Sequence, residues 1–229
     1  MDSINKTQQN AEKLTAAMEA VKLIKDGDVV GLGTGSTATF AIQELAKRVK
    51  TGLKITAAAS SIKTEELATA AGIPVLKLEN LASIDISIDG ADEFTESLDL
   101  VKGGGGALFR EKIIASLSKN AIIITDSSKK VNLLGAFKVP IEVVPLAYQY
   151  VFNKIEALGG KGKLRIKEDA KFITDNGNYI IDVNFGLIDN PAQLALQLNQ
   201  IDGLLAHGLF VGLTKKVIMA KGKEILIFK

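Results

Sequence analysis

Residues 28–49 read DVVGLGTGSTATFAIQELAKRV, and this stretch decides the fold. The short apolar run from Asp28 to Gly33 is typical of a buried strand, and residues 37–49 have the apolar spacing of a helix. A glycine-rich loop, residues 33–37, lies between them. A strand, a glycine loop and a helix in this order begin a β-α-β unit. We therefore expect a parallel sheet with the loop at its carboxyl edge.

The same alternation continues on both sides of this stretch. Apolar residues at helical spacing predict a helix over residues 9–25, ahead of it. The elements predicted after it are strands at 54–59, 75–78, 84–88 and 121–125 and helices at 64–71 and 107–118. Strands that alternate with helices indicate an α/β fold: a doubly wound, Rossmann-like, mostly parallel sheet covered on both faces.

The pattern changes after about residue 130 to the order β-α-β-β-α-β, which is typical of a smaller ferredoxin-like α+β domain. The predicted elements are strands at 141–144, 164–166, 179–183 and 204–211 and helices at 148–158 and 191–200. A hairpin turn is expected at 175–178, with residues 172–174 before it and the strand 179–183 after it. Two last strands, 217–220 and 224–228, are expected to return to the first sheet. We thus expect a catalytic domain of residues 1–132 plus 212–229, and a small domain of residues 133–211.

Composition limits the possible functions. The chain has 229 residues, of which 47% are hydrophobic, enough for a sizeable core. Its 28 basic and 26 acidic residues give a net charge of +2, so we expect neither nucleic acid nor an anionic membrane as a partner. The absence of Cys and the presence of one His exclude thiolate chemistry and multi-histidine metal sites. We expect a cytoplasmic enzyme, since the longest apolar stretch is about half the ~20 residues of a membrane helix.

The glycine loop has the chemistry of an anion site. Glycines let the backbone approach an anion closely, and the hydroxyls of Thr34, Ser36 and Thr37 can donate to it beside a helix N-terminus. The loop is not the dinucleotide fingerprint, because Ser36 stands where the third glycine belongs, nor a P-loop, because no Lys follows. We expect phosphate binding here, with a tight structural turn as the alternative.

Three carboxylates within five residues follow the strand at 84–88, in the segment SIDGADE at 87–93. Gly90 and Ala91 would turn the chain so that Asp89 and Asp92 point to one place. Carboxylates there can accept sugar hydroxyls, move protons or hold a divalent metal such as Mg²⁺. A solvated Asx turn is the structural alternative.

Four consecutive glycines, Gly103–Gly106, lie between Lys102 and a predicted helix that carries Glu111. Such a run is entropically costly, and it is useful where the backbone passes close to a ligand. A flexible linker is the alternative. Lys102 supplies a positive charge at the edge of the run. Glu111, taken alone, is typical of the acids that the helix dipole favours near a helix start.

A fourth polar cluster, residues 125–130, also follows a strand, and its Lys129 can meet an anionic ligand or lie in a surface turn. His207 lies in an apolar segment, which predicts a structural histidine. A parallel sheet brings its strand ends together, so we expect the four clusters to lie near one another. An anion site, two acids, a lysine and a glutamate favour proton transfer on a phosphorylated polar molecule.

The motifs at 34–37, 89–92, 102–105 and 111–113 resemble, in order and spacing, the signatures of the ribose-5-phosphate isomerase type A family. The similarity covers nearly the whole chain, and the fourth glycine, Gly106, is a variation on it. The resemblance implies interconversion of ribose 5-phosphate and ribulose 5-phosphate through an enediolate, in the non-oxidative pentose phosphate pathway. It also implies a small sugar phosphate as ligand, no cofactor or metal, and a homodimer or homotetramer.

The resemblance further implies a role for each matching residue. Glu111 corresponds to the general base and Lys102 to the residue that stabilises the oxyanion, while Asp89 and Asp92 correspond to acids that handle sugar hydroxyls and ring opening. Lys13 is a further candidate for contact with the phosphate. The implied substrate-binding residues are Thr34, Gly35, Ser36, Thr37, Gly90, Ala91, Gly103, Gly104, Gly105 and Lys129.

Other functions stay open at this point. An amino-sugar phosphate deaminase or a CoA transferase would have a related architecture, but the deaminase needs a catalytic histidine and His207 lies in an unsuitable segment. A sugar-phosphate sensor domain of a transcription regulator would bind without turnover and would need a DNA-binding module. A dinucleotide enzyme is least favoured, because its fingerprint is broken.

Overall fold

The computed structural model describes residues 2–229, so that Met1, the first residue of the predicted catalytic domain, lies outside them. Packing divides the chain into two compact units. Unit 1 comprises Met1–Ala91, Ile113–Lys130 and Leu213–Lys229, and unit 2 comprises Asp92–Lys112 and Val131–Gly212. The packing units thus differ from the predicted domains chiefly at residues 92–112, which pack with the second unit. The domain boundaries themselves stay a prediction.

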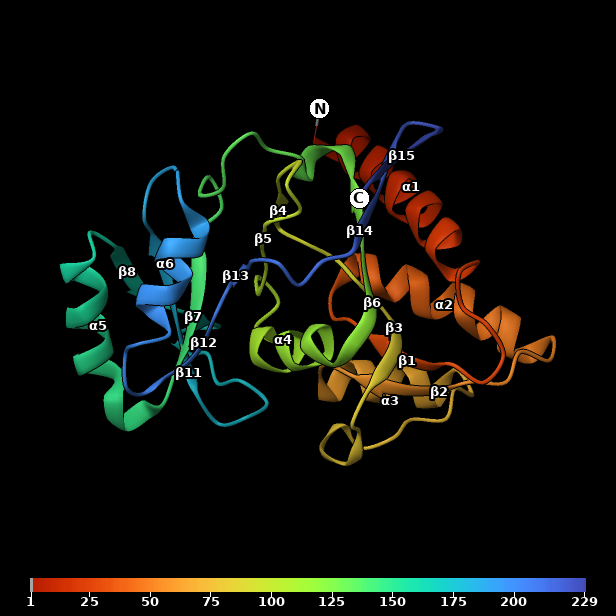
Figure 1. Ribbon diagram of the computed structural model, residues 1–229, viewed down its shortest axis with the longest axis horizontal. Coiled ribbons are helices and arrows are strands. Elements are labelled where there is room, and N and C mark those ends of the chain that lie inside the picture. The colour runs from red at the N-terminus through yellow and green to blue at the C-terminus, as the bar shows by residue number, and fades with distance from the viewer. Residues whose placement is uncertain (1) are drawn as a thin grey trace. The chain divides into compact units, whose positions relative to one another are not determined.

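Unit 1 is built on a six-stranded sheet with the order β15-β14-β6-β3-β1-β2 (Figure 1). Its strands are β1 (Val29–Leu32), β2 (Thr56–Ala59), β3 (Ile84–Asp89), β6 (Ser118–Asp126), β14 (Lys216–Lys221) and β15 (Glu224–Phe228). Neighbouring strands are parallel except for the last hairpin, β14 and β15. The predicted α/β class and the return of the last two strands to this sheet are confirmed.

Helices cover this sheet. They are α1 (Asp2–Val21), α2 (Ser36–Lys50), α3 (Ile62–Ala70) and the second half of α4 (Leu108–Leu117), with short 3-10 turns η1 (Leu78–Asn80) and η2 (Ser127–Lys129). Apolar side chains of α1 and α2 form one core with Val30 and Leu32 of β1. Gly31 faces the opposite way on the strand, and a Cβ there would lie 2.5 Å from Cγ2 of Ile114 on α4. Only a glycine therefore lets α4 pack this closely on β1.

The predicted strand at 75–78 is wrong. Val75 forms a single parallel bridge with Ala57 of β2, and η1 begins at Leu78. The segment lies at the edge of the sheet and leaves it at Leu76, which is exposed. One bridge at an edge gives too few backbone hydrogen bonds to continue a strand.

Unit 2 contains the predicted β-α-β-β-α-β order. Its elements are β7 (Val139–Val143), α5 (Tyr148–Ala157), β8 (Lys161–Leu164), β11 (Tyr179–Asn184), α6 (Pro191–Leu198) and β12 (Leu204–His207). They form an antiparallel sheet with the order β12-β7-β11-β8. Smaller elements are the sheet of β4 (Glu93–Phe94), β5 (Leu100–Val101) and β13 (Leu209–Phe210), the hairpin of β9 (Ile166–Lys167) and β10 (Ala170–Lys171), and η3 (Pro145–Ala147). The ferredoxin-like arrangement is confirmed.

Two predictions within unit 2 need correction. The strand predicted at 204–211 is two strands in different sheets, divided at Gly208, where a Cβ would lie 2.4 Å from the carbonyl oxygen of Lys102. The turn at 175–178 exists, but residues 172–174 are not a strand that pairs with β11. Side chains close this turn instead: Thr174 Oγ1 and Asn178 Nδ2 both donate to the buried carboxylate of Glu142, at 2.8 and 3.0 Å.

Candidate functional site

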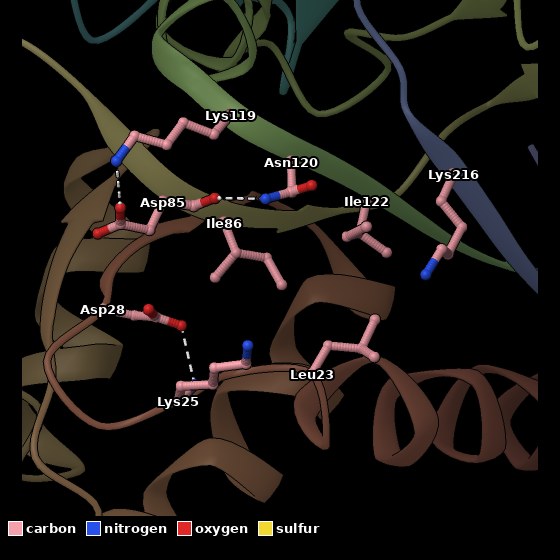
Figure 2. Close-up of a pocket in the computed structure, with 9 residues that line it drawn as sticks. All are labelled: Leu23, Lys25, Asp28, Asp85, Ile86, Lys119, Asn120, Ile122 and Lys216. Carbon is pink, nitrogen blue, oxygen red and sulfur yellow. Dashed lines mark hydrogen bonds and ion pairs between the residues drawn. The ribbon is translucent and has the colours of Figure 1, made fainter.

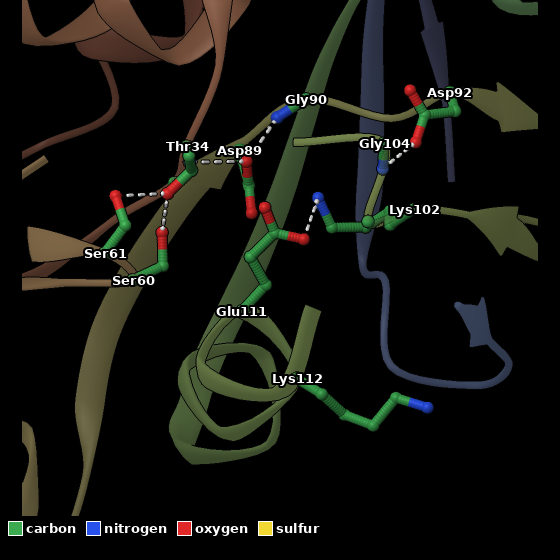
Figure 3. Close-up of polar contacts among 12 residues, drawn as sticks. Thr34, Ser60, Ser61, Asp89, Gly90, Asp92, Lys102, Gly104, Glu111 and Lys112 are labelled. Carbon is green, nitrogen blue, oxygen red and sulfur yellow. Dashed lines mark hydrogen bonds and ion pairs between the residues drawn. The ribbon is translucent and has the colours of Figure 1, made fainter. Parts of the chain in front are cut away.

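The glycine loop leaves β1 beside the carboxylate of Asp89. A Cβ on Gly33 would lie 1.9 Å from Asp89 Oδ1, so only glycine allows this approach. The loop is held from below by hydroxyls, because Thr34 Oγ1 is hydrogen-bonded with Ser60 Oγ at 2.7 Å and donates to Ser61 Oγ at 2.9 Å (Figure 3). Gly35 has a positive φ of 103° and precedes the first residue of α2. The loop thus directs its backbone to the N-terminus of a helix, where an anion is favoured.

Asp89 is the last residue of β3, the strand next to β1. Its side chain is buried, and Oδ1 accepts the backbone N–H of Thr34 at 3.2 Å and that of Gly90 at 2.7 Å (Figure 3). Two backbone donors therefore fix the orientation of this carboxylate. Ala91 follows Gly90 and is the last residue of the first segment of unit 1.

The polar cluster of residues 125–130 lies where β6 ends, on the other side of β3. Asp126 is buried and its Oδ1 accepts the N–H of Ser128 at 3.1 Å. Lys13 of α1 lies 4.0 Å from Asp126 Oδ2 and donates to Ser36 Oγ of the glycine loop at 3.3 Å. Lys129 ends η2, in the same segment. The strand ends of β1, β3 and β6 thus place three of the four predicted clusters together.

The remaining cluster, from Lys102 to Glu111, belongs to unit 2, so the prediction that it lies at a strand end of the parallel sheet is wrong. Lys102 follows β5, a strand of the small antiparallel sheet. Its Nζ lies 3.3 Å from Oε2 of Glu111, which is in the first turn of α4, and both side chains are about 4% exposed (Figure 3). Each charge is expensive to bury alone, so each stabilises the other in this dry setting.

The glycine run between these two residues is not a free linker. Gly104 N–H donates to Asp92 Oδ2 at 2.8 Å, which orients the Asp92 carboxylate. Arg165 Nη1 donates to the carbonyls of Gly103 and Gly104, at 3.2 and 3.1 Å. Gly103 has a positive φ of 99°, which favours glycine there. The run, including Gly105, is therefore ordered backbone held by two charged side chains.

Lys112 and His207 form a buried pair in unit 2. Burial lowers the pKa of Lys112 to about 7. Burial and then the nearby charge of Lys112 lower the pKa of His207 to about 3, so the imidazole is neutral at physiological pH. His207 Nε2 contacts Asn199 Oδ1 at 3.1 Å. This placement fits the predicted structural histidine.

Sequence reasoning missed Arg165, Lys112 and the hydroxyls of Ser60 and Ser61. The two serines follow β2, so the strand-end rule that found the other clusters could have found them. Arg165 stands between two apolar residues of an expected strand, which is only a weak signal. Apart from its place in the resembled motif, nothing in the local sequence marks Lys112.

A pocket of about 380 Å³ lies in unit 1 at the opposite edge of the sheet, where β3, β6 and β14 begin (Figure 2). Two of its charges are engaged with each other, since Lys119 Nζ lies 2.7 Å from Asp85 Oδ1. The hydrogen bond from Lys119 is the main cause of a lowered Asp85 pKa. No predicted site residue lines this pocket.

Within residues 2–229 no group of three or more His, Cys, Asp or Glu side chains is placed to hold a metal ion. Over the same residues, no helix combines the length and the apolar character that a membrane span requires.

Known proteins resemble this chain over most of its length. The model of the family described as ribose 5-phosphate isomerase A (phosphoriboisomerase A) matches residues 56–224. A ribose-5-phosphate isomerase A from Sphingopyxis alaskensis is 46% identical over 215 residues, which cover 94% of this chain and 94% of that protein. The chain belongs to the ribose 5-phosphate isomerase A family. The ribose-5-phosphate isomerase A of Desulfatibacillum aliphaticivorans is 48% identical over 218 residues, or 93% of this chain and 95% of its own.

Solved structures of ribose 5-phosphate isomerases share the fold. Isomerase A from Methanocaldococcus jannaschii has a TM-score of 0.91 at 39% identity, covering 96% of this chain and 98% of its own. A D-ribose-5-phosphate isomerase in complex with phospho-erythronic acid has a TM-score of 0.93 at 36% identity, covering 96% and 99%. As a ribose 5-phosphate isomerase A, this chain is an aldose–ketose isomerase of the pentose phosphate pathway (EC 5.3.1.6) that interconverts ribose 5-phosphate and ribulose 5-phosphate. The deaminase, transferase, sensor and dinucleotide alternatives are therefore set aside.

Proposed function

We propose that Glu111 is the general base of this isomerisation and that Lys102 stabilises the oxyanion that develops. The observation that carries the proposal is the buried pair itself, with Lys102 Nζ 3.3 Å from Glu111 Oε2. In a dry setting an ammonium stabilises a developing negative charge far more than it does in water. The pair thus supplies a proton acceptor and a cation within reach of two adjacent substrate atoms.

The reaction begins when the furanose opens, with Asp89 or Asp92 moving the proton between the hydroxyl and the ring oxygen. Glu111 then removes the C2 proton, the C2–H electrons form the C1–C2 double bond, and the carbonyl electrons move to O1, where Lys102 donates. C1 takes the proton back from Glu111, and the O2 proton passes to O1, which gives the ketose. General base catalysis contributes ~10²–10⁴ in rate. An oxyanion donor contributes ~10²–10³.

The phosphate of the substrate is assigned to the loop of residues 34–37. Its support is the set of backbone amides and hydroxyls at the start of α2, and the approach of Lys13 Nζ to Ser36 Oγ. Lys129, where β6 ends, is assigned to the same anion. Backbone groups at Gly90, Ala91 and Gly103–Gly105 are assigned to the sugar. The related isomerase that binds phospho-erythronic acid supports a phosphorylated ligand of this size. Binding energy from the phosphate then serves to position C1 and C2.

We also propose that the enzyme needs no cofactor or metal, that it works in the cytoplasm, and that it is a homodimer or homotetramer. The motif resemblance supports all three. Large apolar side chains exposed on unit 2 support a subunit contact there, because such residues often mark interfaces. They include Leu146, Leu187 and Leu196.

The test is turnover of ribose 5-phosphate in the presence of a chelator, with a Glu111→Gln variant beside the wild type. We expect kcat to fall by ~10²–10⁴ with little change in KM, because the amide keeps the shape but cannot accept the proton. Glu156→Gln, an exposed position on α5, is the matched control and should keep full activity. A Glu111→Gln enzyme with most of its activity would remove Glu111 as the base. Activity lost in chelator and restored by Mg²⁺ would overturn the metal-free route.

A further inference from the structure

Lys112, the residue after Glu111 on α4, is a partly buried side chain whose Nζ has three polar partners. Its Nζ donates to the carbonyl of His207 at 2.7 Å and to that of Leu209 at 2.9 Å. The third contact, at 3.3 Å, is His207 Nδ1, which accepts if the imidazole proton is on Nε2. In its protonated form the group has three N–H donors, which matches the three acceptors around it. All three are neutral groups of one short segment, residues 207–209.

This segment also holds the backbone of Lys102. The two carbonyls that Lys112 binds lie on either side of Gly208, whose own carbonyl accepts the N–H of Lys102 at 2.9 Å. The contact is tight, because a Cβ on Gly208 would lie 2.4 Å from the Lys102 carbonyl oxygen. Leu209 continues the register by pairing with Val101 of β5, the residue before Lys102. Lys112 is therefore hydrogen-bonded to the same segment that is hydrogen-bonded to the backbone of Lys102.

The ring of Phe210, the residue after this segment, lies near the Nζ atoms of both Lys102 and Lys112. Lys112 Nζ lies 4.9 Å and Lys102 Nζ lies 5.4 Å from the centroid of its ring. Both distances are within the range of cation–π attraction. The ring thus restrains the side chain of Lys102, while Lys112 restrains the backbone that carries the ring.

We propose that Lys112 is a positioning residue that fixes the spacing between Glu111 and Lys102. Consecutive residues of a helix point about 100° apart, and Figure 3 shows Glu111 and Lys112 leaving α4 in different directions. Glu111 is directed to Lys102, and Lys112 to the segment 207–209. One helical turn is thereby tied to the strand beside Lys102, and the 3.3 Å separation of the pair follows from that tie. The inference rests on the catalytic roles proposed above for Glu111 and Lys102.

The structure offers a matched control on the other side of the base. Arg110 donates to Asn176 Oδ1 at 2.9 Å and to the Asp175 carbonyl at 3.3 Å. It therefore ties α4 to the turn at 175–178 instead of the segment that holds Lys102. Arg110→Met removes two hydrogen bonds of the same helical turn and leaves the contacts of Lys112 with residues 207–209 intact.

The experiment compares Lys112→Met, Lys112→Arg and Arg110→Met in the isomerisation of ribose 5-phosphate. Values of kcat are divided by the folded fraction measured by circular dichroism. We expect Lys112→Met to lower kcat by about 10–100-fold with KM changed less than about threefold, because sub-ångström placement of the base governs the chemical step. Lys112→Arg should recover at least about a fifth of wild-type kcat, since it restores charged donors to the carbonyls. Arg110→Met should stay within about threefold of wild type.

Two results would overturn the proposal: an unchanged kcat per folded chain in Lys112→Met, or an equal fall in Lys112→Met and Arg110→Met. If Lys112→Met does not fold, Lys112→Gln, which keeps one amide donor, is judged by the same criteria. The Glu111→Gln variant distinguishes failure of the proposed base from failure of the proposed positioning role. Turnover by Glu111→Gln contradicts the assignment of the base, whereas a dead Glu111→Gln beside a fully active Lys112→Met contradicts only the positioning role.

Discussion

Replacing Gly33 with alanine should displace the Asp89 carboxylate without removing it. The new Cβ would lie 1.9 Å from Asp89 Oδ1, whereas ordinary contacts begin at 3.4 Å. The backbone cannot retreat easily, because Gly33 N–H donates to the carbonyl of Ile88 at 3.0 Å within the sheet. The carboxylate must therefore move by about 1.5 Å, the difference between the two distances.

A movement of this size breaks the contacts that orient Asp89. Its Oδ1 loses the N–H of Thr34 at 3.2 Å and that of Gly90 at 2.7 Å. A catalytic group misplaced by ~1 Å loses ~10²-fold in rate. We therefore expect kcat of Gly33→Ala to fall about 100-fold, which corresponds to about 2.7 kcal/mol in the activation free energy. Overpacking should lower the free energy of unfolding by about 1–3 kcal/mol.

The assay is the initial rate of ribulose 5-phosphate formation, with urea unfolding as the measure of stability. Gly52→Ala is the control: Gly52 has a φ of +112° but nothing within 4 Å of the added Cβ. It should lose about 1 kcal/mol of stability through backbone strain and keep its kcat. In the double variant with Asp89→Asn, the two losses of rate should be far from additive, because both act through one carboxylate. A folded Gly33→Ala enzyme with a kcat within threefold of wild type, or full additivity with Asp89→Asn, would refute this reasoning.

The remaining predictions concern stability and pH. Burial lowers the His207 pKa from 6.5 to about 3, so the unfolded chain binds more protons between these values. The free energy of unfolding should fall with falling pH in this window by up to ~1.4 kcal/mol per unit, and urea titrations of His207→Gln should show a flatter slope. In Glu12, burial acts to raise the pKa but the N–H groups of Gly222 and Ser127 outweigh it, so the pKa is lowered from 4.5. Glu12→Gln should cost roughly 2–3 kcal/mol and lower Tm by roughly 5–10 °C in calorimetry above that pH. This difference should disappear as the pH falls through the lowered pKa, and an unchanged Tm would contradict the role given to Glu12.

Local sequence predicted most of the fold because the decisive signals are local. The apolar run and the glycine loop placed β1 and α2 within one or two residues of their observed bounds. The failures lie where distant segments decide. Nothing near Gly208 in the sequence indicates that the backbone of Lys102 passes beside it, yet this approach divides the predicted strand at 204–211. The bridge of Val75 likewise depends on where the sheet has its edge.

The site was predictable to the extent that it follows a parallel sheet. The loop at 33–37, Asp89 and the segment 125–130 were located by the rule that strand ends meet, and the structure places them together. Lys102 and Glu111 obey no such rule, since one follows an antiparallel strand and the other lies in the first turn of a helix, and family resemblance supplied the roles proposed for them. Arg165 and Lys112 were missed because their partners are distant in sequence: Gly103 is 62 residues from Arg165, and His207 is 95 from Lys112.

The glycine run before α4 explains why such distant partners are needed. Four glycines cost up to about 1 kcal/mol each in lost backbone freedom, and they cannot fix the start of the helix that carries Glu111. Charged side chains hold the run instead: Asp92 accepts one N–H and Arg165 donates to two carbonyls. Hydrogen bonds to charged groups contribute ~1.5–3 kcal/mol each, so three of them are of the same size as the entropy lost. Within α4, Lys112 Nζ likewise donates to two backbone carbonyls, those of His207 and Leu209. Because the glycine run cannot fix its own conformation, the side chains of Asp92, Arg165 and Lys112 must hold it and the helix that follows. The position of the proposed base, Glu111, therefore depends on these three side chains more than on the helix itself.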